Sequence, residues 1–504
     1  MVKYQVRIEP LGLTYIVDAG TSLQEVLRNC DIDFPCGGKG LCGNCKVRLL
    51  SGNVSMDEKQ VSWLNKKGLS EEWRLACLSK VEDNLVLEIP QVGMQIQTDE
   101  ARVSDFVPES GYGVAVDVGS TTIVAQVVDL GNGQVVDTCS EVNPQISYGA
   151  DIISRIEYAM QKKENLLQLC HILRGCIGKM LYTLTIRNSI SSFQKVVLAG
   201  NTVMHHLFAG YDVASLATAP YHSDSNEGYV LLSTALEWDF IKPCPVEFLP
   251  NLSHFVGSDI LCGIQSCGMV QEEEYKLLID LGTNGEMALG NKHHVLYTST
   301  AAGPAFEGIN ISCGMRAIEG AIYAVEEIGE HTCKYEIIGD KQAKGLCGSG
   351  LIEVIHWLLR HGDIDVTGAM TDLTRREISL TKEVTLTIED IREFQLAKAA
   401  LAAGVELLLK EYNISVSQIS QVFFTGGLGN YLDVDKIKEL GLFTKFENSK
   451  IVRLSNASLS GCRQFLFDSN REKIVSILRN KEFCSLETKK EFQDVFCEQI
   501  FFPY

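Results

Sequence analysis

Two segments of the chain repeat one pattern, a buried apolar strand that ends in an aspartate and runs into a polar glycine turn. They cover residues 114–122 and 277–285. A second strand follows each turn, and the later copy continues through a Gly-Asn hairpin into a third. Each copy is followed by a buried strand that leads into a small-residue turn and a helix, at residues 196–201 and 422–427. A hairpin-rich start followed by α/β units, made twice, predicts two lobes with a cleft between them.

The two turns have the composition of a phosphate site. Asp117 and Asp280 end the strands, and glycine, hydroxyl and amide residues follow each of them. Such turns offer N–H and O–H donors to phosphate, and a carboxylate holds Mg2+ directly or through water. One turn of this kind arises by chance, whereas two in a matching repeat are strong evidence. The residues expected to bind the nucleotide in these turns are Gly119, Ser120, Thr121, Thr122, Gly282, Thr283 and Asn284.

A third glycine-rich turn, residues 425–430, follows the last buried strand. Glycines let an adenine and ribose lie against the backbone where a side chain would block them, which adds Gly426 and Gly427 to the site. Through these three motifs, residues 113–467 resemble the actin, sugar kinase and heat-shock chaperone ATPase superfamily. The resemblance implies a duplicated ribonuclease H-like (actin-like) ATPase that binds ATP with Mg2+. It further implies that Asp117 and Asp280 are catalytic, beside the metal and the attacking water.

One more acidic residue, Glu286, follows the second turn. It is a candidate for positioning the water, although a simple role in a surface strand is the favoured alternative.

Four cysteines near the N-terminus, Cys36, Cys42, Cys45 and Cys77, have the spacing C-x5-C-x2-C-x31-C. Thiolates are soft donors that suit iron clusters, and glycines in the 36–45 loop leave backbone N–H groups free to point at sulfides. A structural zinc site also takes four cysteines, but it more often pairs two C-x2-C knuckles, and this loop has one. An iron–sulfur cluster is therefore favoured over zinc.

Residues 1–97 resemble a β-grasp ferredoxin, which implies a [2Fe–2S] cluster on these four cysteines. Alternation over residues 3–8 and 12–18 predicts a hairpin, Thr21 or Ser22 is expected to cap a helix over residues 23–27, and residues 85–89 read as a closing strand. Cys30 is expected at the end of the helix, in the core. The chain is thus expected to be multi-domain, α+β and α/β. A linker at 98–112 joins the two regions. A helical extension at 468–504 either docks on the ATPase core or contributes to a homodimer.

Charge and hydropathy exclude several classes of partner. The net charge of -19 argues against nucleic acid or an anionic membrane, since both require a basic surface. The start of the chain lacks a signal-peptide h-region, and no apolar run reaches the roughly 18 residues of a spanning helix. We therefore expect a cytoplasmic protein, whose 17 cysteines are metal ligands or core residues rather than disulfides.

Several other segments carry weaker signals. Residues 345–350 lead into a helix and form either an anion-binding N-terminus or an ordinary turn. Residues 143–145 and 302–308 look like cleft loops without an assignable role. Packing is favoured over metal binding for His205 and His206, because adjacent residues point to different helix faces. Core thiols are favoured over a second cluster for two cysteine pairs, Cys170 with Cys176 and Cys262 with Cys267.

A one-electron carrier joined to an ATPase indicates an acceptor that is hard to reduce. Moving one electron uphill by roughly 200 mV costs about 4.6 kcal/mol, which an ATP-driven conformational cycle can supply. The order of ferredoxin, linker and duplicated ATPase resembles the reductive activators of corrinoid proteins. The motifs N-P-Q, A-G-P-A-F-E-G, G-L-C-G-S-G and T-G-G-L-G-N are similar to sequences of that family. The resemblance implies ATP-dependent transfer of one electron from the cluster to Co(II) cobamide, which regenerates Co(I) for methyl transfer.

The same resemblance implies two protein partners, an upstream electron donor and a corrinoid protein of an anaerobic methyltransferase system. Activators of the acetyl-CoA pathway's corrinoid iron–sulfur protein carry an extra domain where this chain has only residues 98–112. A methyltransferase system for methoxy compounds or methylamines is therefore favoured, with the individual corrinoid partner and the reductant left open.

Two other functions remain as alternatives. The first is an ATP-driven electron donor to another low-potential enzyme, as in the dehydratase activators, and the N-terminal cysteines argue against it. The second is a small-molecule kinase regulated by its ferredoxin domain, for which no acceptor pocket or base is identifiable. Actin-like filament formation is a more distant option, because it leaves the cluster without a purpose.

Overall fold

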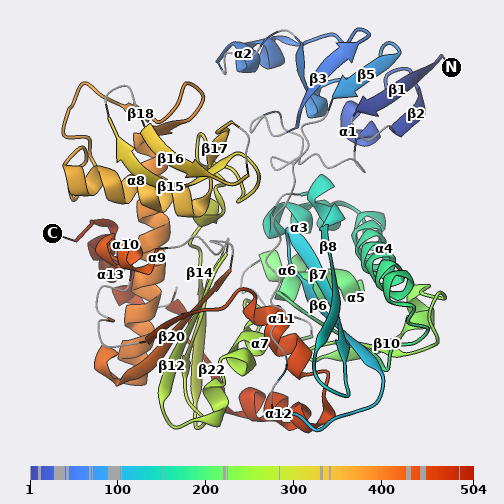
Figure 1. The fold of residues 1–504 in the computed structure, drawn as a ribbon, viewed down its shortest axis with the longest axis vertical. Helices are drawn as coiled ribbons and strands as arrows, with labels where there is room; N and C mark the ends of the chain where they lie inside the picture. Colours follow the sequence, from blue (N-terminus) through green and yellow to red (C-terminus); the bar gives the residue numbers. More distant parts are fainter. Residues whose placement is uncertain are drawn as a thin grey trace.

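The fold is taken from a computed structural model, shown in Figure 1. No helix among the residues it describes has the length and apolar character needed to cross a bilayer. The described residues are 2–9, 13–27, 40, 45–66, 70, 72–88, 103, 105–149, 151–218, 223, 225–282, 284–329, 333–339, 342–426, 433–442, 446, 450–486 and 489–503.

The N-terminal domain is a five-stranded sheet in the order β2-β1-β5-β3-β4. β1 is antiparallel to β2 and parallel to β5, so the expected hairpin and closing strand are both confirmed over the described residues. Ser22 caps the short helix α1 by accepting a hydrogen bond from the backbone of Gln24 at 3.2 Å. The elements are β1 (Lys3–Glu9), β2 (Leu13–Asp18), α1 (Leu23–Val26), β3 (Lys46–Ser51), α2 (Glu58–Lys66), β4 (Trp73–Leu75), η1 (Ala76–Leu78) and β5 (Leu85–Glu88).

The first lobe is built on a six-stranded sheet in the order β10-β11-β9-β6-β7-β8. β6, β7 and β8 form an antiparallel meander, and β9 joins β6 in parallel. The long helix α4 packs on β7 and β8. The elements are β6 (Tyr112–Val118), β7 (Thr122–Asp129), β8 (Val135–Val142), η2 (Pro144–Ser147), α3 (Ile152–Gln161), α4 (Lys163–Asn188), β9 (Lys195–Gly200), α5 (Thr202–Ala209), α6 (Ala214–Ala217), β10 (Tyr229–Leu232), η3 (Ser233–Leu236) and β11 (Pro245–Phe248).

The second lobe repeats this topology with the sheet order β21-β20-β12-β13-β14-β22. β12, β13 and β14 again form an antiparallel meander, and β20 joins β12 in parallel. The main sheet and its helices are β12 (Tyr275–Leu281), β13 (Gly285–Gly290), β14 (Val295–Thr300), α9 (Ile388–Tyr412), β20 (Ile419–Gly426), α10 (Val434–Glu439), β21 (Lys450–Arg453) and β22 (Lys481–Phe483).

A smaller layer of the second lobe consists of a three-stranded sheet, a two-stranded sheet and the helix α8, which packs on β15. Its elements are η5 (Pro304–Glu307), β15 (Ala321–Ile328), β16 (Cys333–Ile337), β17 (Gly345–Leu346), α8 (Gly348–His361), β18 (Glu377–Ser379) and β19 (Thr385–Thr387).

The two sheets match residue by residue where the repeat was recognised in the sequence. Val118 of β6 lies opposite Gly200, and Leu281 of β12 lies opposite Gly426. A Cβ atom at either glycine would fall 2.6 Å from the carbonyl oxygen of the residue opposite. Each lobe therefore needs glycine where its second parallel strand ends, and the expected duplication is confirmed at atomic detail.

Two helices lie between the two lobes (Figure 1). α7 (Ser258–Ser266) contacts β9 of the first lobe and both β12 and β13 of the second. α11 (Ala457–Gln464) follows β21 of the second lobe yet packs on β6 and β9 of the first. The helices touch at Gly461, where a Cβ atom would fall 1.9 Å from the carbonyl oxygen of Cys262. The lobes thus meet on a tightly packed helix pair.

The C-terminal region adds a strand to what the sequence predicts as a helical extension. Besides α12 (Arg471–Asn480) and α13 (Lys490–Ile500), it supplies β22, which extends the second sheet parallel to β14. Phe502 is 3% exposed, and the buried ammonium of Lys398 donates to the carbonyl oxygen of Phe501 at 2.6 Å. Of the two expected roles, docking on the ATPase core is the one that the structure shows.

Phe502→Ala is expected to lower the free energy of unfolding by about 3 kcal/mol, because it empties a buried aromatic site beside Phe394. Chemical denaturation of the full chain measures the change. Phe501→Ala is the matched control: that side chain is 53% exposed, and its backbone bond to Lys398 is kept. Equal losses for the two variants would contradict the assignment.

Candidate functional site

A cavity of about 340 Å³ is lined by residues of both lobes. Of the residues that the sequence predicts for the nucleotide, Thr283 and Gly427 lie outside the described part of the chain. The remaining ones all line this cavity: Asp117, Gly119, Ser120, Thr121, Thr122, Asp280, Gly282, Asn284 and Gly426. The structure therefore brings the three motifs of the sequence together in one place.

Asp117 is held by two side chains from the start of α11. Asn456 donates to Oδ2 of Asp117 and Ser458 donates to Oδ1, both at 2.8 Å. Burial raises the pKa of Asp117, and the two hydrogen bonds act against that rise. Since Asp117 belongs to the first lobe and α11 follows the second sheet, these bonds also tie the lobes together across the base of the cavity.

Asp280 stands among other carboxylates in the same cavity. Burial raises its pKa to about 8, and the charges of Asp259, Asp117 and Glu307 add to the rise. Burial likewise raises the pKa of Asp259 to about 7. Such a group of buried acids is stable with full negative charge only beside a cation. Among the described residues that line the cavity, Arg316 is the single basic side chain.

Asp259 is a site residue that sequence reasoning missed. It lies in the first turn of α7, one residue after the helix begins. An acidic residue at a helix start is common as a favourable partner of the helix dipole, so the local sequence does not mark it as functional. Only the crossing of α7 beneath both sheets brings it to the cavity.

Glu286 is buried rather than on the surface, so the favoured strand-surface role is wrong. The side chain is 7% exposed and lines the cavity, and its residue lies opposite Asp280 in the β12–β13 register. The helices α7 and α9 pack on β13, and all the residues of this strand are buried. Burial raises the pKa of Glu286 well above its usual range.

The first phosphate turn is held from behind by two fully buried side chains. Asn143 donates to the carbonyl oxygen of Gly119 at 2.9 Å, and Arg155 donates to that of Ser120 at 2.5 Å. Both donors are 0% exposed. Because these carbonyl groups accept hydrogen bonds from behind, they do not point toward an anion bound in the cavity. The N-P-Q loop, to which the sequence assigns no role, thus positions the turn between β6 and β7.

The second lobe closes the opposite wall of the cavity. η5, from the A-G-P-A-F-E-G motif, supplies Phe306 and Glu307, and α8 begins with Gly348 at the cavity wall. Cys347, which precedes α8, does not cap the helix with its side chain. No capping side chain of Cys347 therefore occupies the first backbone N–H groups of α8. Of the two expectations for residues 345–350, this placement favours the anion-facing helix start.

Gly426 is required where β20 meets the carboxylates. Its φ angle is +99°, and a Cβ atom there would fall 2.5 Å from Oδ1 of Asp280. Any side chain would therefore push Asp280 aside. The first glycine of the T-G-G motif is thus explained by close approach to the acid as well as by the expected contact with adenosine.

In the N-terminal domain, two of the four expected cluster ligands lie side by side. The sulfur atoms of Cys45 and Cys77 are 3.2 Å apart, well beyond the ~2.05 Å of a disulfide bond. The Ala76 N–H donates to the carbonyl oxygen of Cys45 at 2.9 Å, which fixes η1 beside the start of β3. Cys30, Cys36 and Cys42 lie outside the described residues. Two thiols that are distant in sequence thus converge, as a shared cluster requires.

The two adjacent histidines and the two cysteine pairs named from the sequence lie in the core or at its edge. His205 and His206 are both 0% exposed; His205 packs against the rings of Tyr229 and Phe248, as expected for a packing role. Among the two cysteine pairs, Cys170, Cys262 and Cys267 are buried and Cys176 is half-buried. In the described part of the chain, no three His, Cys, Asp or Glu side chains form a metal site by themselves.

Three family descriptions match the chain. Residues 6–82 match the 2Fe-2S iron-sulfur cluster binding domain, residues 112–272 the RACo middle region, and residues 274–504 the C-terminal domain of RACo, the ASKHA domain. The chain therefore combines an iron–sulfur cluster domain with an ATP-binding domain of the actin-like class, as expected from the sequence.

Relatives match over most of the chain. The corrinoid activation enzyme RamQ of Eubacterium limosum is 30% identical over 436 residues, which cover 80% of this chain and 73% of the relative. The [Co(II) methylated amine-specific corrinoid protein] reductase of Methanosarcina barkeri is 24% identical over 421 residues, 77% of this chain and 76% of the relative. A solved structure described as a reductive activator for corrinoid, iron-sulfur protein is 26% identical, has a TM-score of 0.70 and covers 99% of this chain and 98% of its own. With its cluster domain, its duplicated ATPase lobes and these likenesses, the chain belongs to the family of reductive activators of corrinoid proteins.

Proposed function

We propose that this chain carries out ATP-dependent reduction of Co(II) cobamide in a corrinoid protein. An iron–sulfur cluster held by the N-terminal cysteines would supply the one electron that converts Co(II) to Co(I), ready for methyl transfer. The observation that carries the proposal is the presence, in one chain of this family, of convergent cluster thiols and of an acid-lined cavity between two ATPase lobes. ATP hydrolysis supplies the free energy that an uphill electron transfer requires.

The cluster that we propose is of the [2Fe–2S] type, held by Cys36, Cys42, Cys45 and Cys77. A [2Fe–2S] cluster takes four thiolates, and one short knuckle with a distant fourth cysteine suits it better than zinc. The 3.2 Å separation of the Cys45 and Cys77 sulfur atoms supports a shared metal centre. The cluster supplies reversible one-electron chemistry, while the chain holds it and shields it.

The cavity fits a Mg2+ ion that arrives with the nucleotide. Mg2+ usually keeps several waters and takes one or two carboxylates together with substrate phosphates, rather than a cage made by protein alone. Asp117 and Asp280 supply such carboxylates. Each carboxylate oxygen of Asp117 accepts one hydrogen bond, from Asn456 or from Ser458. This donor set agrees with the lack of a preformed metal site among the described residues.

The roles in hydrolysis follow from charge and burial. The phosphate turns and the start of α8 bind the phosphates, and Asp117 and Asp280 hold the metal or its waters. Water attacks the terminal phosphorus, the bond to the bridging oxygen breaks, and the water proton passes to a carboxylate. Glu286 is the candidate for that proton, because it lines the cavity opposite Asp280, and the charge of a bound metal would favour its ionised form against the effect of burial. Arg316 offsets negative charge on the transferred group.

Ser458→Ala is expected to lower the rate of ATP hydrolysis about tenfold, because it removes one of two donors that orient Asp117 and costs about 1.4 kcal/mol. Phosphate release at saturating ATP measures the rate. Alanine also favours the helix, so α11 is kept. Ser460→Ala, in the same helix but not at the cavity wall, is the control. A full rate in Ser458→Ala would show that Asp117 needs no such support.

The carboxylates predict that Mg2+ binding strengthens from pH 6 to pH 8. Asp259 and Asp280, with pKa values of about 7 and 8, hold protons at pH 6 that the metal must displace. Without metal, these raised pKa values cost folding free energy as the pH rises through them, so the metal-free protein loses stability toward pH 8. The melting temperature is measured with and without Mg2+ at each pH. The gain from Mg2+ should be largest at pH 8 and smaller in Asp259→Asn; an equal gain at pH 6 and pH 8 would contradict this.

The partners we propose are a corrinoid protein of a methyltransferase system and an upstream protein that returns an electron to the cluster. The net charge of -19 supports protein partners rather than nucleic acid or an anionic membrane. We place the reaction in the cytoplasm, where thiols stay reduced. A homodimer stays a prediction that size measurement in solution tests.

The function is tested anaerobically with reconstituted protein, a chemical reductant and a Co(II) corrinoid protein. The absorbance of Co(I) is followed with ATP, without nucleotide and with a non-hydrolysable analogue. Co(I) should form only with ATP. Hydrolysis without reduction of any corrinoid protein would overturn the cobalt assignment and direct attention to other low-potential acceptors.

A further inference from the structure

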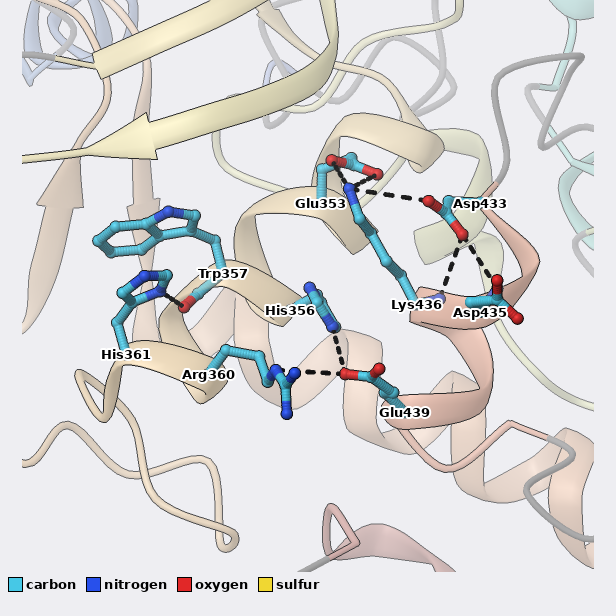
Figure 2. A network of polar contacts seen from close by, with 9 residues as sticks. All are labelled: Glu353, His356, Trp357, Arg360, His361, Asp433, Asp435, Lys436 and Glu439. Atoms are coloured by element: carbon cyan, nitrogen blue, oxygen red, sulfur yellow. Dashed lines mark hydrogen bonds and ion pairs between the residues drawn. The ribbon is translucent and has the colours of Figure 1, made fainter.

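A set of ion pairs joins α8 to α10 outside the cavity (Figure 2). Nζ of Lys436 lies 2.9 Å and 2.7 Å from the two carboxylate oxygens of Glu353. One turn further along α10, Glu439 accepts from His356 at 2.8 Å and pairs with Arg360 at 3.4 Å. The two helices are therefore connected at an inner and an outer point.

The inner pair is much more buried than the outer one. The Glu353 side chain is 6% exposed and that of Lys436 is 31%, whereas Glu439 is 47% and Arg360 66% exposed. Glu353 also accepts from the backbone N–H of Val325 on β15, at 3.4 Å. It thus links three elements of the second lobe, α8, α10 and β15.

A buried ion pair is weak evidence of stability. The cost of taking both charges out of water is comparable to their attraction, and an apolar pair of similar size often serves stability as well or better. An ion pair between helices does fix one register, because the charges meet in a single arrangement. The Glu353 side chain is buried, like a run of mostly apolar residues around it in α8, so an apolar side chain would suit this position. The presence of a charged residue at position 353 therefore needs an explanation other than stability.

One of the two helices starts at the nucleotide cavity, and the other follows in the chain a strand that ends there. α8 begins at Gly348, which lines the cavity, and Glu353 follows five residues later. α10 follows β20, whose last residue, Gly426, lines the same cavity against Asp280. Asp433, the N-cap of α10, accepts from the backbone of Lys436 at 3.3 Å, so the lysine belongs to the first turn of its helix.

We propose that Glu353 and Lys436 are positioning residues for ATP. By fixing the register of α10 on α8, the pair holds Gly348 and Gly426 at the separation that the nucleotide needs. Neither side chain lines the cavity, so the pair acts on affinity through these two backbone positions. The inference rests on the proposed binding of ATP in this cavity and adds to it the residues that set the affinity.

The decisive variant replaces both charges with apolar side chains of similar length, Glu353→Met with Lys436→Met. The melting temperature should stay at or above that of the native chain, while the dissociation constant for ATP, measured by equilibrium titration, rises about tenfold. The KM for ATP should rise in parallel, with kcat at saturating ATP kept. Glu439→Gln, which weakens only the outer exposed pair, is the matched control and should change the dissociation constant less than about twofold.

Native affinity in the double Met variant, with native stability, would overturn the proposal. If that variant does not fold, Glu353→Gln decides, since it keeps the shape and removes the charge: weaker ATP binding supports the proposal, and unchanged binding overturns it. Failure of the proposed ATP site gives a different result, because the native chain itself would then bind no ATP. Failure of the cobalt assignment alone leaves ATP binding, and therefore this test, unchanged.

Discussion

Asp280→Asn is expected to lower the rate of ATP hydrolysis by a factor of about one hundred or more, the usual loss when one charged group that stabilises a transition state is removed. The variant keeps the volume of the side chain beside Gly426, where space is tight. It removes one negative charge from a group that includes Asp117, Asp259 and Glu307. The metal then loses a carboxylate, although the cavity keeps its shape.

The measurement is phosphate release at saturating Mg2+ and ATP, with the visible spectrum of the cluster as a check on the N-terminal domain. Asp239→Asn changes an exposed aspartate away from the cavity and is the matched control. Because burial disfavours a charged carboxylate at this position, the neutral amide of Asp280→Asn should also melt at or above the native temperature without Mg2+, most clearly at pH 8. A variant that keeps a third or more of the native rate would show that Asp280 is not catalytic.

The sequence predicts the part of the site that is local in the chain. Asp117 and Asp280 each end an apolar run and precede a glycine turn, so their place at the end of a strand follows from pattern alone. The duplicated topology follows as well, because the two copies share that pattern. The boundaries set at 97, 112 and 467 stay predictions.

The part of the site that the sequence does not predict depends on contacts between distant segments. Asp259, Asn456 and Ser458 reach the cavity only because α7 and α11 cross between the lobes. Each of them sits near a helix start, where Asp, Asn and Ser are common as caps, and so carries no separate local signal. The burial of Glu286 likewise depends on distant segments, because α7 and α9 pack on β13.

The same reason explains the missed elements of the fold. β22 is three residues long and mixed in polarity, and it becomes a strand by pairing with the edge of β14. β4 is equally short and pairs with β3. A strand of three residues is too short to be recognised by alternation of apolar and polar residues. Its formation depends on pairing with a neighbouring strand.

Cys77→Ser is expected to abolish Co(II) reduction while ATP hydrolysis continues. Loss of one thiolate removes a ligand from the cluster, and the cluster is the only proposed route for the electron. The described hydrogen bonds of the cavity involve residues 117–458, none of them in the cluster domain, so the nucleotide site should keep its geometry. The measurements are iron and sulfide content, visible absorbance, phosphate release and the formation of Co(I).

Cys497→Ser is the control, because Cys497 is an exposed cysteine outside the N-terminal domain. It should keep the cluster and both activities. Metal analysis of the native chain separates the two interpretations of the cysteine pattern, since a zinc site would contain neither iron nor sulfide and would give no visible absorbance. If Cys77→Ser reduced Co(II) at the native rate, the electron would take a path other than this cluster. ATP hydrolysis alone moves no electron, and the proposed mechanism has no other redox centre.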